Sequence, residues 1–234
     1  MHHARVTAAR MLSPTVRELT LDAGREFRFV PGQWVSLRLP QPNGEEIARA
    51  YSIASAPRDD GRFDLAVTRV DGGPGSEFLH AIEPGATLRM THAQGFFTLE
   101  PAARPILLVA TGTGISPLRS MLIAGARDPE VTAQPCVLLF GCRTAADVLY
   151  AADFEALPTA WPGFRFEPTL SRAGAGWTGR TGYVQTHVPE LVRALGGDCD
   201  VYACGLSKMI REVRAVLKDQ LGFTRERIHT ERYD

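Results

Sequence analysis

Polar and hydrophobic residues alternate through most of the first hundred positions of the chain. Between Thr15 and Asp22, Val16, Leu19 and Leu21 lie among polar neighbours, a pattern typical of a half-buried strand. Similar stretches predict strands at residues 4–11, 34–39, 47–54, 63–70 and 86–91, separated by turn residues. Six short strands with a single helical-looking insert, at 76–82, predict an antiparallel six-stranded β-barrel.

After about residue 105 the pattern changes to apolar strands that alternate with amphipathic segments. The strands are predicted at 106–111, 136–141, 164–170, 200–204 and 227–231, and the helices at 116–126, 147–157, 189–195 and 207–221. We expect Ser116 to cap the first of these helices, with Pro117 at its first position. Strands alternating with helices predict a doubly wound parallel α/β sheet.

The change of pattern lies between Pro101 and Pro105. We therefore predict two domains, a β-barrel over residues 1–101 and an α/β domain over residues 102–234. A chain of 234 residues is long enough for two compact domains.

Composition narrows the classes of function. Lys and Arg together number 26, as do Asp and Glu, and this balance argues against nucleic acid or an anionic membrane surface as a partner. The apolar runs are too short to cross a bilayer, and the first residues lack the apolar core of a signal peptide. We expect a cytoplasmic protein, with a monomer as the default.

Four cysteines lie in the second half of the chain: Cys136, Cys142, Cys199 and Cys204. Their spacing forms neither C-x-x-C nor the C-x4-C-x2-C run of a plant-type iron–sulfur site. We expect no metal site, and for the first three cysteines the simplest interpretation is a small buried residue.

Two glycine loops are candidate phosphate sites. Gly112-Thr113-Gly114 lies between a strand and a helix, where glycines allow close approach and the helix N-terminus attracts an anion. Gly72-Gly73-Pro74-Gly75-Ser76 also precedes a predicted helix. An ordinary tight turn and a flexible hairpin loop are the respective alternatives.

The first of these loops departs from the standard dinucleotide fingerprint. Pro117 stands where a third glycine is usual, and the second strand ends in Gly141-Cys142-Arg143 without an acidic residue. The sequence therefore argues against a standard Rossmann NAD site.

A third candidate is Arg49-Ala50-Tyr51-Ser52, within the predicted strand 47–54. Arg49 and Tyr51 face one side of that strand and Ser52 the other. A cation, a flat ring and a hydroxyl suit a ligand with a phosphate and a flat redox-active ring. The alternative is a packed tyrosine beside a solvated charge.

Taken in chain order, Pro31-Gly32-Gln33, Arg49-Ala50-Tyr51-Ser52, the loop from Gly73 to Ser76, Gly112-Thr113-Gly114, Cys204-Gly205 and the tail Glu231-Arg232-Tyr233 resemble the ferredoxin–NADP reductase family of flavin-dependent reductases. The resemblance covers nearly the whole chain and implies a barrel that binds FAD and an α/β domain that binds NADP or NAD. FAD is favoured over FMN because two-domain members without a fused ferredoxin most often carry FAD.

The resemblance implies roles on the flavin side. Arg49 would hold the flavin pyrophosphate, Tyr51 would stack on the isoalloxazine, and Ser52 would donate toward flavin N5. Further implied contacts are Ala50, the backbone of Val67, Thr68 and Arg69, and the phosphate loop residues Gly73, Gly75 and Ser76.

On the nucleotide side, the resemblance assigns the pyrophosphate to Gly112, Thr113 and Gly114. Cys204 and Gly205 would lie beside the nicotinamide. In the family the terminal aromatic residue, here Tyr233, covers the flavin, although one further residue, Asp234, follows it here. Glu231 would pair with Ser52 as a proton route. The implied catalytic residues are Ser52, Cys204, Glu231 and Tyr233.

The choice of nicotinamide depends on Ser171-Arg172, which matches the family's pair for the 2′-phosphate of NADP. Arg180 and Tyr183 could add to that pocket, and we include Arg143 among the cofactor-binding candidates. The alternative is a loop charge at Arg172, because relatives that use NADH carry a similar run. The pattern favours NADPH.

The implied function is transfer of a hydride from NADPH or NADH to FAD, then of electrons to an external acceptor such as ferredoxin, flavodoxin or an oxygenase component. One alternative is an electron-transfer or regulatory flavin subunit of a larger redox complex. Such subunits usually carry an additional cysteine cluster near the C-terminus, which this chain lacks. A flavin module with an inactive nucleotide site is disfavoured by the intact loop 112–117.

Overall fold

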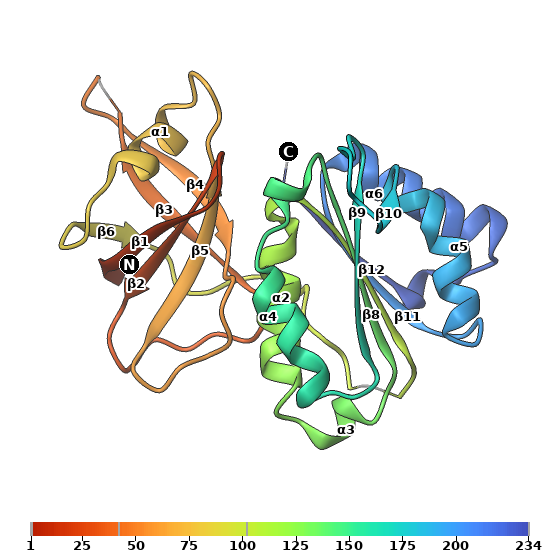
Figure 1. Cartoon of the computed structure of the whole chain (residues 1–234). Helices are drawn as coiled ribbons and strands as arrows, with labels where there is room; N and C mark the ends of the chain where they lie inside the picture. The colour runs from red at the N-terminus through yellow and green to blue at the C-terminus, as the bar shows by residue number, and fades with distance from the viewer. Residues whose placement is uncertain (1, 42, 102, 234) are drawn as a thin grey trace.

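Two six-stranded sheets form the framework of the molecule (Figure 1). The structure is a computed structural model that describes residues 2–41, 43–101 and 103–233. The first sheet is antiparallel, in the order β4-β3-β6-β1-β2-β5. Its strands are β1 (His2–Ser13), β2 (Val16–Asp22), β3 (Trp34–Pro40), β4 (Glu46–Ser52), β5 (Arg62–Thr68) and β6 (Thr87–Met90), with α1 (Pro74–Ala81) between β5 and β6. This arrangement confirms the predicted antiparallel sheet.

The first sheet curls until its two edge strands meet at one end only. Ile53 bridges Leu65, and the Ala54 amide donates to the Asp64 carbonyl at 2.8 Å. Extending that antiparallel register puts Tyr51 opposite Val67, yet no ladder joins β4 and β5 there in the described part of the chain. The barrel is therefore split along one seam, and the seam lies beside Arg49 to Ser52.

The second sheet is parallel, in the order β10-β9-β8-β7-β11-β12. Its strands are β7 (Ile106–Thr111), β8 (Cys136–Cys142), β9 (Phe164–Leu170), β10 (Arg180–Thr181), β11 (Asp200–Gly205) and β12 (Ile228–Arg232). The chain runs outward from β7 to β10 and then crosses back to β11 on the other side of β7. Ligands bind at such a reversal, outside the carboxyl ends of the strands, which here are β7 and β11.

Helices cover both faces of this sheet (Figure 1). They are α2 (Ile115–Gly125), α3 (Pro129–Thr132), α4 (Ala151–Ala156), α5 (Val184–Ala194) and α6 (Ser207–Ala215). Side chains along β7 point alternately to the two faces, so Leu108 joins the cluster under α2 and α4, and Leu107 joins the one under α5 and α6. The doubly wound parallel sheet is confirmed.

Several predicted elements differ in detail. Helix α2 begins at Ile115, directly after a 3-10 turn over Gly112–Gly114, so Ser116 lies inside its first turn and does not cap it. The predicted helix 147–157 shortens to α4, because Tyr150 just before it adopts a left-handed backbone with φ 57°. Packing of Val184, Val188 and Leu191 extends α5 through Pro189.

Two further differences concern the strand edges and the last helix. The short edge strand β10 was not predicted, and α6 ends in a π-helical turn, Val216–Gln220. The predicted domain boundary between residues 101 and 102 lies in the connection from β6 to β7; Ala102 is outside the described residues, and the boundary stays a prediction.

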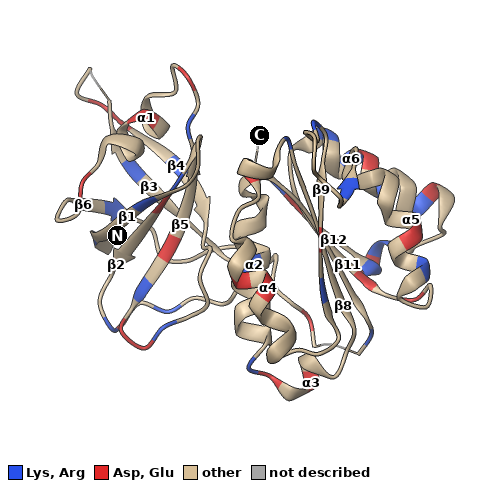
Figure 2. Cartoon of the chain, in the orientation of Figure 1, with Lys and Arg blue, Asp and Glu red and all other residues tan. Residues whose placement is uncertain are grey.

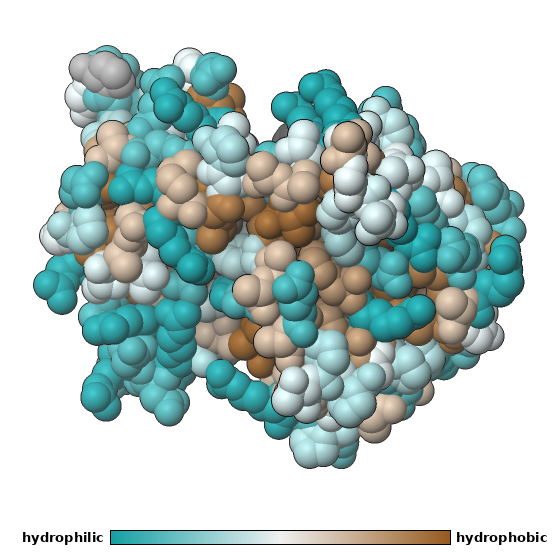
Figure 3. Space-filling view, in the orientation of Figure 1, coloured by the Kyte–Doolittle hydropathy of each residue, from teal (hydrophilic) through white to brown (hydrophobic). Residues whose placement is uncertain are grey.

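The surface is mixed in charge and locally apolar. Basic and acidic residues are interspersed over both domains (Figure 2), and apolar residues gather on the visible face where the domains meet (Figure 3). No helix in the described part of the chain is long and apolar enough to cross a membrane.

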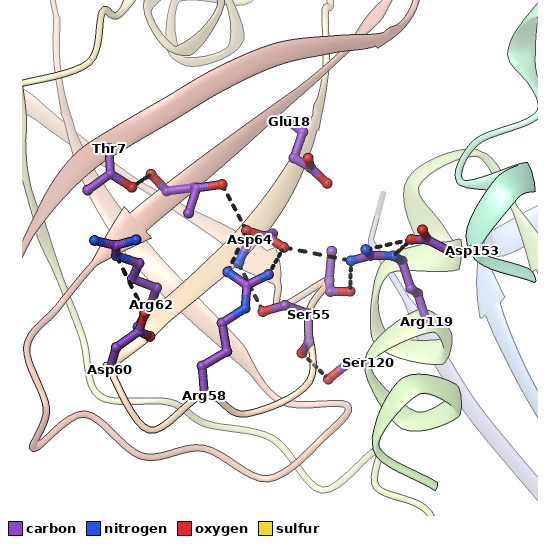
Figure 4. Close-up of polar contacts among 12 residues, drawn as sticks. Thr7, Glu18, Ser55, Arg58, Asp60, Arg62, Asp64, Arg119, Ser120 and Asp153 are labelled. Carbon is purple, nitrogen blue, oxygen red and sulfur yellow. Dashed lines mark hydrogen bonds and ion pairs between the residues drawn. The ribbon is translucent and has the colours of Figure 1, made fainter. Parts of the chain in front are cut away.

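The Arg119 guanidinium joins the two domains (Figure 4). From α2 it donates to the Ala54 carbonyl at 2.7 Å and to Asp153 at 2.7 Å, and it lies 3.8 Å from the Asp64 carboxylate. Ser120, the next residue, donates to the Ser55 carbonyl at 2.6 Å. Beneath these contacts one apolar cluster includes residues of both domains, among them Val16, Ala54, Ala66, Ile115 and Leu118.

We expect Arg119→Ala to lower the free energy of unfolding by about 3 kcal/mol, because it leaves a buried carboxylate without one of its cations. Among the described residues, Asp64 would then keep one cationic partner, Arg58, whose Nη2 lies 2.5 Å from Oδ2. Equilibrium urea unfolding measures the change. The matched control, Arg127→Ala on the exposed end of the same segment, should stay within about 0.5 kcal/mol of the parent; equal losses in both variants would contradict the interface role.

Candidate active site at the domain junction

The Arg49 to Ser52 stretch forms the end of the edge strand β4. Arg49 is exposed and its Nη1 donates to the Ala48 carbonyl at 2.9 Å. Tyr51 is half-buried, and burial raises the pKa of its hydroxyl to about 12, while the positive charge of Arg49 acts in the opposite direction. The edge strand thus presents the neutral Tyr51 ring beside the exposed Arg49 guanidinium. This pair suits a ligand that has a flat ring and a phosphate.

On the other side of the seam, the end of β5 supplies Val67, Thr68 and Arg69. The Val67 side chain is buried in the barrel core, and its carbonyl oxygen lies 2.9 Å from His80 Nε2. The Arg69 amide donates to the Thr15 carbonyl at 2.8 Å. These backbone groups are therefore fixed, whereas the Thr68 and Arg69 side chains are exposed at the seam.

The glycine loop before α1 is closed by its own serine. Ser76 Oγ accepts from the Val70 amide at 3.0 Å and donates to the Gly73 carbonyl at 2.9 Å. A Cβ at Gly75 would lie 3.0 Å from Leu39 Cδ1, so glycine lets α1 pack closely on β3. The Gly75 and Ser76 amides belong to the first turn of α1, where backbone N–H groups have no partner within the helix.

The second glycine loop is packed against the end of β11. A Cβ at Gly114 would lie only 2.3 Å from the Cys204 carbonyl oxygen, so no larger residue fits there. Thr111 Oγ1 and Ser116 Oγ flank the loop, and both are buried with no hydrogen-bond partner in the described chain. A buried hydroxyl without a hydrogen-bond partner lowers stability unless a ligand or a water molecule supplies that partner.

Glu231 connects the two domains at this point. Register pairs Glu231 on β12 with Cys204 on β11. Ser52 Oγ of the barrel donates to Glu231 Oε1 at 3.1 Å, and Cys204 Sγ lies 4.0 Å from the same oxygen. Burial raises the pKa of Glu231, and the Ser52 hydrogen bond opposes that shift. Burial, and then the Glu231 charge, raises the pKa of Cys204 well above its ordinary value.

A second contact across the junction joins the seam to the Gly112 to Gly114 loop. Thr68 Oγ1 lies 3.4 Å from Thr113 Oγ1. The structure therefore brings together residues of the Arg49 to Ser52 stretch, the Gly112 to Gly114 loop, the Cys204-Gly205 pair and the tail, with Thr68 of β5 beside them. The Gly72 to Ser76 loop and Ser171-Arg172 are not among these contacts.

The tail lies over the second glycine loop. Tyr233 OH donates to the Thr111 carbonyl at 2.9 Å and accepts from the Gly114 amide at 3.3 Å. The ring is partly exposed. The hydroxyl thus takes the hydrogen bond of the Gly114 amide, which was predicted to bind a nucleotide pyrophosphate. Asp234, the residue after it, is outside the described residues.

The predicted 2′-phosphate residues lie in two loops tied by backbone hydrogen bonds. The Ser171 amide donates to the Cys142 carbonyl at 3.0 Å, and the Arg172 amide to the Arg143 carbonyl at 2.8 Å. Arg143 and Arg172 are both exposed. The loops after β8 and β9 therefore present two cations and one hydroxyl at the carboxyl edge of the sheet.

Arg180 is engaged elsewhere. Its Nη1 and Nη2 donate to the two Glu190 oxygens at 2.8 and 2.9 Å, and its Nε donates to Glu167 at 3.0 Å. These hydrogen bonds, those to Glu190 first, raise the pKa of the guanidinium. Any nucleotide phosphate would compete with two carboxylates for this side chain. Tyr183, proposed with it, is exposed.

Sequence reasoning did not include Thr111 and Ser116 among the candidate site residues. Each is a polar residue at the edge of an apolar run next to the predicted loop, and that position was the available signal. The unpaired state of their hydroxyls depends on the packing of the loop against β11, which sequence spacing does not report.

The raised pKa of Glu231 predicts a pH-dependent contribution to stability. At pH values between the ordinary pKa of 4.5 and the higher pKa of the folded state, Glu231 is protonated in the folded protein but not in the unfolded chain. The contribution of Glu231 to the free energy of unfolding therefore falls as pH rises. We expect Glu231→Gln to melt progressively higher relative to the parent as pH increases from about 4.5 to 7. Thermal unfolding at a series of pH values measures the difference, and a constant offset would contradict it.

The geometry fits the groups that the family resemblance implies. The split edge of the barrel offers an aromatic ring, a cation and a helix start, and the α/β domain offers unpaired hydroxyls beside a glycine loop at the reversal of strand order. Two family models agree with this division: the oxidoreductase FAD-binding domain matches residues 3–99, and the oxidoreductase NAD-binding domain matches residues 108–215.

Individual relatives match the whole chain. It is 52% identical to ferredoxin–NADP reductase B of Sorangium cellulosum, over 99% of this chain and 97% of that protein. It is 29% identical to the phenol hydroxylase P5 protein of Acinetobacter pittii over 99% of this chain, but it spans only 65% of that longer protein.

Solved structures share the fold. The Amycolatopsis cytochrome P450 reductase GcoB superposes with a TM-score of 0.85 at 28% identity, over 99% of this chain and 69% of that one. A ferredoxin–NADP reductase from Neisseria gonorrhoeae, solved with bound FAD and NADP, superposes with a TM-score of 0.86 at 21% identity, over 99% and 98% of the two chains. With its FAD-binding barrel, its NAD-binding α/β domain and this match along its full length, the chain belongs to the ferredoxin–NADP reductase family of flavin-dependent oxidoreductases.

Proposed function

We propose that this chain uses NADPH to reduce FAD and passes the electrons to a small external carrier protein. The observation that supports the proposal is that the candidate flavin residues of the barrel meet the candidate nucleotide residues of the α/β domain at the domain junction. Ser52 of the barrel donates to Glu231 of the α/β domain at 3.1 Å, and Thr68 lies 3.4 Å from Thr113. FAD, when bound, supplies the chemistry that accepts a hydride and releases single electrons.

On the barrel side, the residues at the split edge would bind and orient the flavin. Arg49 is exposed and can pair with the pyrophosphate, while the neutral Tyr51 ring offers a stacking face. The first-turn amides at Gly75 and Ser76 add hydrogen-bond donors for phosphate. Ser76 contributes through its amide rather than its hydroxyl, because Oγ already closes the loop onto Val70 and Gly73.

On the nucleotide side, the Gly112 to Gly114 loop would hold the pyrophosphate. Thr111 and Ser116 supply hydroxyls that lack protein partners in the described chain. Cys204 and Gly205, at the end of β11, would form the wall beside the nicotinamide. The thiol would serve there as a neutral contact surface, because its raised pKa keeps the proton on Sγ.

The preference for NADPH is assigned to Arg143, Ser171 and Arg172. Two exposed guanidinium groups and a hydroxyl in adjoining loops suit a dianionic 2′-phosphate. Arg180 is left out of this pocket, since Glu167 and Glu190 occupy its guanidinium.

Glu231 would supply and take up protons at the buried centre. Its raised pKa lets Oε1 hold a proton at a higher pH than an exposed carboxyl does, and Ser52 Oγ lies within hydrogen-bond distance. A proton could pass from Glu231 through the Ser52 hydroxyl toward the flavin edge.

The carrier protein is assigned by analogy. One relative is a ferredoxin–NADP reductase, and others are the electron transfer components of anthranilate and toluate dioxygenases. A ferredoxin, a flavodoxin or an oxygenase component are the acceptors we propose. Membership of a fixed multi-subunit complex is the alternative; it predicts slow reduction of free carriers.

The first test is an anaerobic absorbance titration of the FAD-loaded protein with NADPH and with NADH in parallel. Near-stoichiometric bleaching by NADPH, with a much weaker response to NADH, is the expected result. Arg172→Gln should raise the KM for NADPH by about tenfold or more and change that for NADH little, because only the 2′-phosphate contact is lost. Arg127→Gln is the charge-matched control. Equal KM changes for both nucleotides would remove Arg172 from the pocket.

A second test concerns the tail. If the nucleotide pyrophosphate takes the Gly114 amide, the Tyr233 hydroxyl must leave it first. Tyr233→Phe removes that competition, so we expect NADP to bind about threefold more tightly, with FAD affinity unchanged. Isothermal calorimetry on the FAD-loaded protein measures both; weaker NADP binding would mean that the hydroxyl assists the nucleotide instead.

A further inference from the structure

A basic pocket lies between α6 and the edge strand β12. Its volume is about 420 Å³, and its lining residues are Ser207, Ile210, Arg211, Arg214, Thr230 and Arg232. None of these residues has been assigned a role in the flavin or nucleotide half-sites. The volume lies in the range of small-molecule sites in proteins.

The two elements build the pocket through their regular periodicity. Ser207, Ile210, Arg211 and Arg214 follow each other at helical spacing, so they share one face of α6. Thr230 and Arg232 alternate with Glu231 along β12, so they face the side of the strand opposite to the Ser52 contact. The pocket is therefore separated from the flavin side of Glu231 by the thickness of the sheet.

Three guanidinium groups line this space, those of Arg211, Arg214 and Arg232. No carboxylate lies within ion-pair distance of Arg211, Arg214 or Arg232 among residues 2–41, 43–101 and 103–233. Other arginines in the same domain, such as Arg180 and Arg227, each pair with two carboxylates. In a chain with equal numbers of basic and acidic residues, this is a local excess of positive charge, and the mutual repulsion is relieved by a bound anion.

We infer that this pocket binds a small polyanion that carries phosphoryl groups. Guanidinium forks match phosphoryl oxygens in pairs, and the Thr230 hydroxyl adds a further polar contact. A hollow of this size favours a compact ligand over the flat surface of a partner protein. The ligand joins α6 to β12 and so supports the strand that carries Glu231.

The test is isothermal calorimetry of tripolyphosphate binding to the FAD-loaded protein at constant ionic strength. Arg211→Gln and Arg214→Gln should each weaken binding by about tenfold or more, since each removes a charged hydrogen-bond donor pair. Arg193→Gln, which removes an exposed charge from α5, and Arg172→Gln, in the proposed nucleotide pocket, should leave this affinity unchanged. Because Arg211 is exposed, its variant keeps the test valid if Arg214→Gln fails to fold.

Three results would overturn the inference. They are the absence of binding to the parent protein, binding that is lost in Arg172→Gln but kept in Arg211→Gln, and equal weakening in all four variants. The second result would assign tripolyphosphate to the nucleotide pocket, and the third would reduce it to general attraction by net charge. The inference is independent of the proposed reductase activity, which the nucleotide titration tests separately.

Discussion

The hydrogen bond from Arg119 to the Ala54 carbonyl, 2.7 Å long, is the contact on which the arrangement of the two domains depends. Ala54 follows Ser52 by two residues, and Arg119 lies on the helix that begins directly after the Gly112 to Gly114 loop. This one guanidinium therefore fixes the end of β4 relative to the Gly112 to Gly114 loop. The two carboxylates of Asp153 and Asp64 balance the charges of Arg119 and Arg58, so the joint is neutral and can remain buried.

Successive side chains of β12 point to opposite faces of the sheet, so the two faces of this strand carry different groups. Glu231 points to the junction, where burial raises its pKa beside Ser52 and Cys204. Thr230 and Arg232, its neighbours, line the basic pocket with α6. A ligand in that pocket and a proton on Glu231 thus act on the same five-residue strand, whose register with β11 sets the position of both.

Several motif residues are already engaged within the protein. The Ser76 hydroxyl closes its own loop, the Arg180 guanidinium pairs with Glu167 and Glu190, and the Tyr233 hydroxyl occupies the Gly114 amide. These side chains therefore shape the candidate site, and in the proposed binding mode the ligand contacts fall to backbone amides and to the hydroxyls of Thr111 and Ser116, which have no hydrogen-bond partner in the described part of the chain. A motif match therefore predicts where a residue lies in the fold better than it predicts which of its atoms is available to a ligand.

The sequence alone determined the two sheets, their antiparallel and parallel character and the stretches that form the junction, because hydrophobic period and glycine position are local properties of the chain. Tertiary structure decided the rest. The left-handed Tyr150 shortens α4, and packing carries α5 through Pro189. The Arg180 guanidinium pairs with Glu167 and Glu190, which the fold brings to it from β9 and α5. The contact between Ser52 and Glu231 spans 179 positions. Such contacts depend on how the domains dock, and no local pattern encodes the distance between two atoms that only the docked fold brings together.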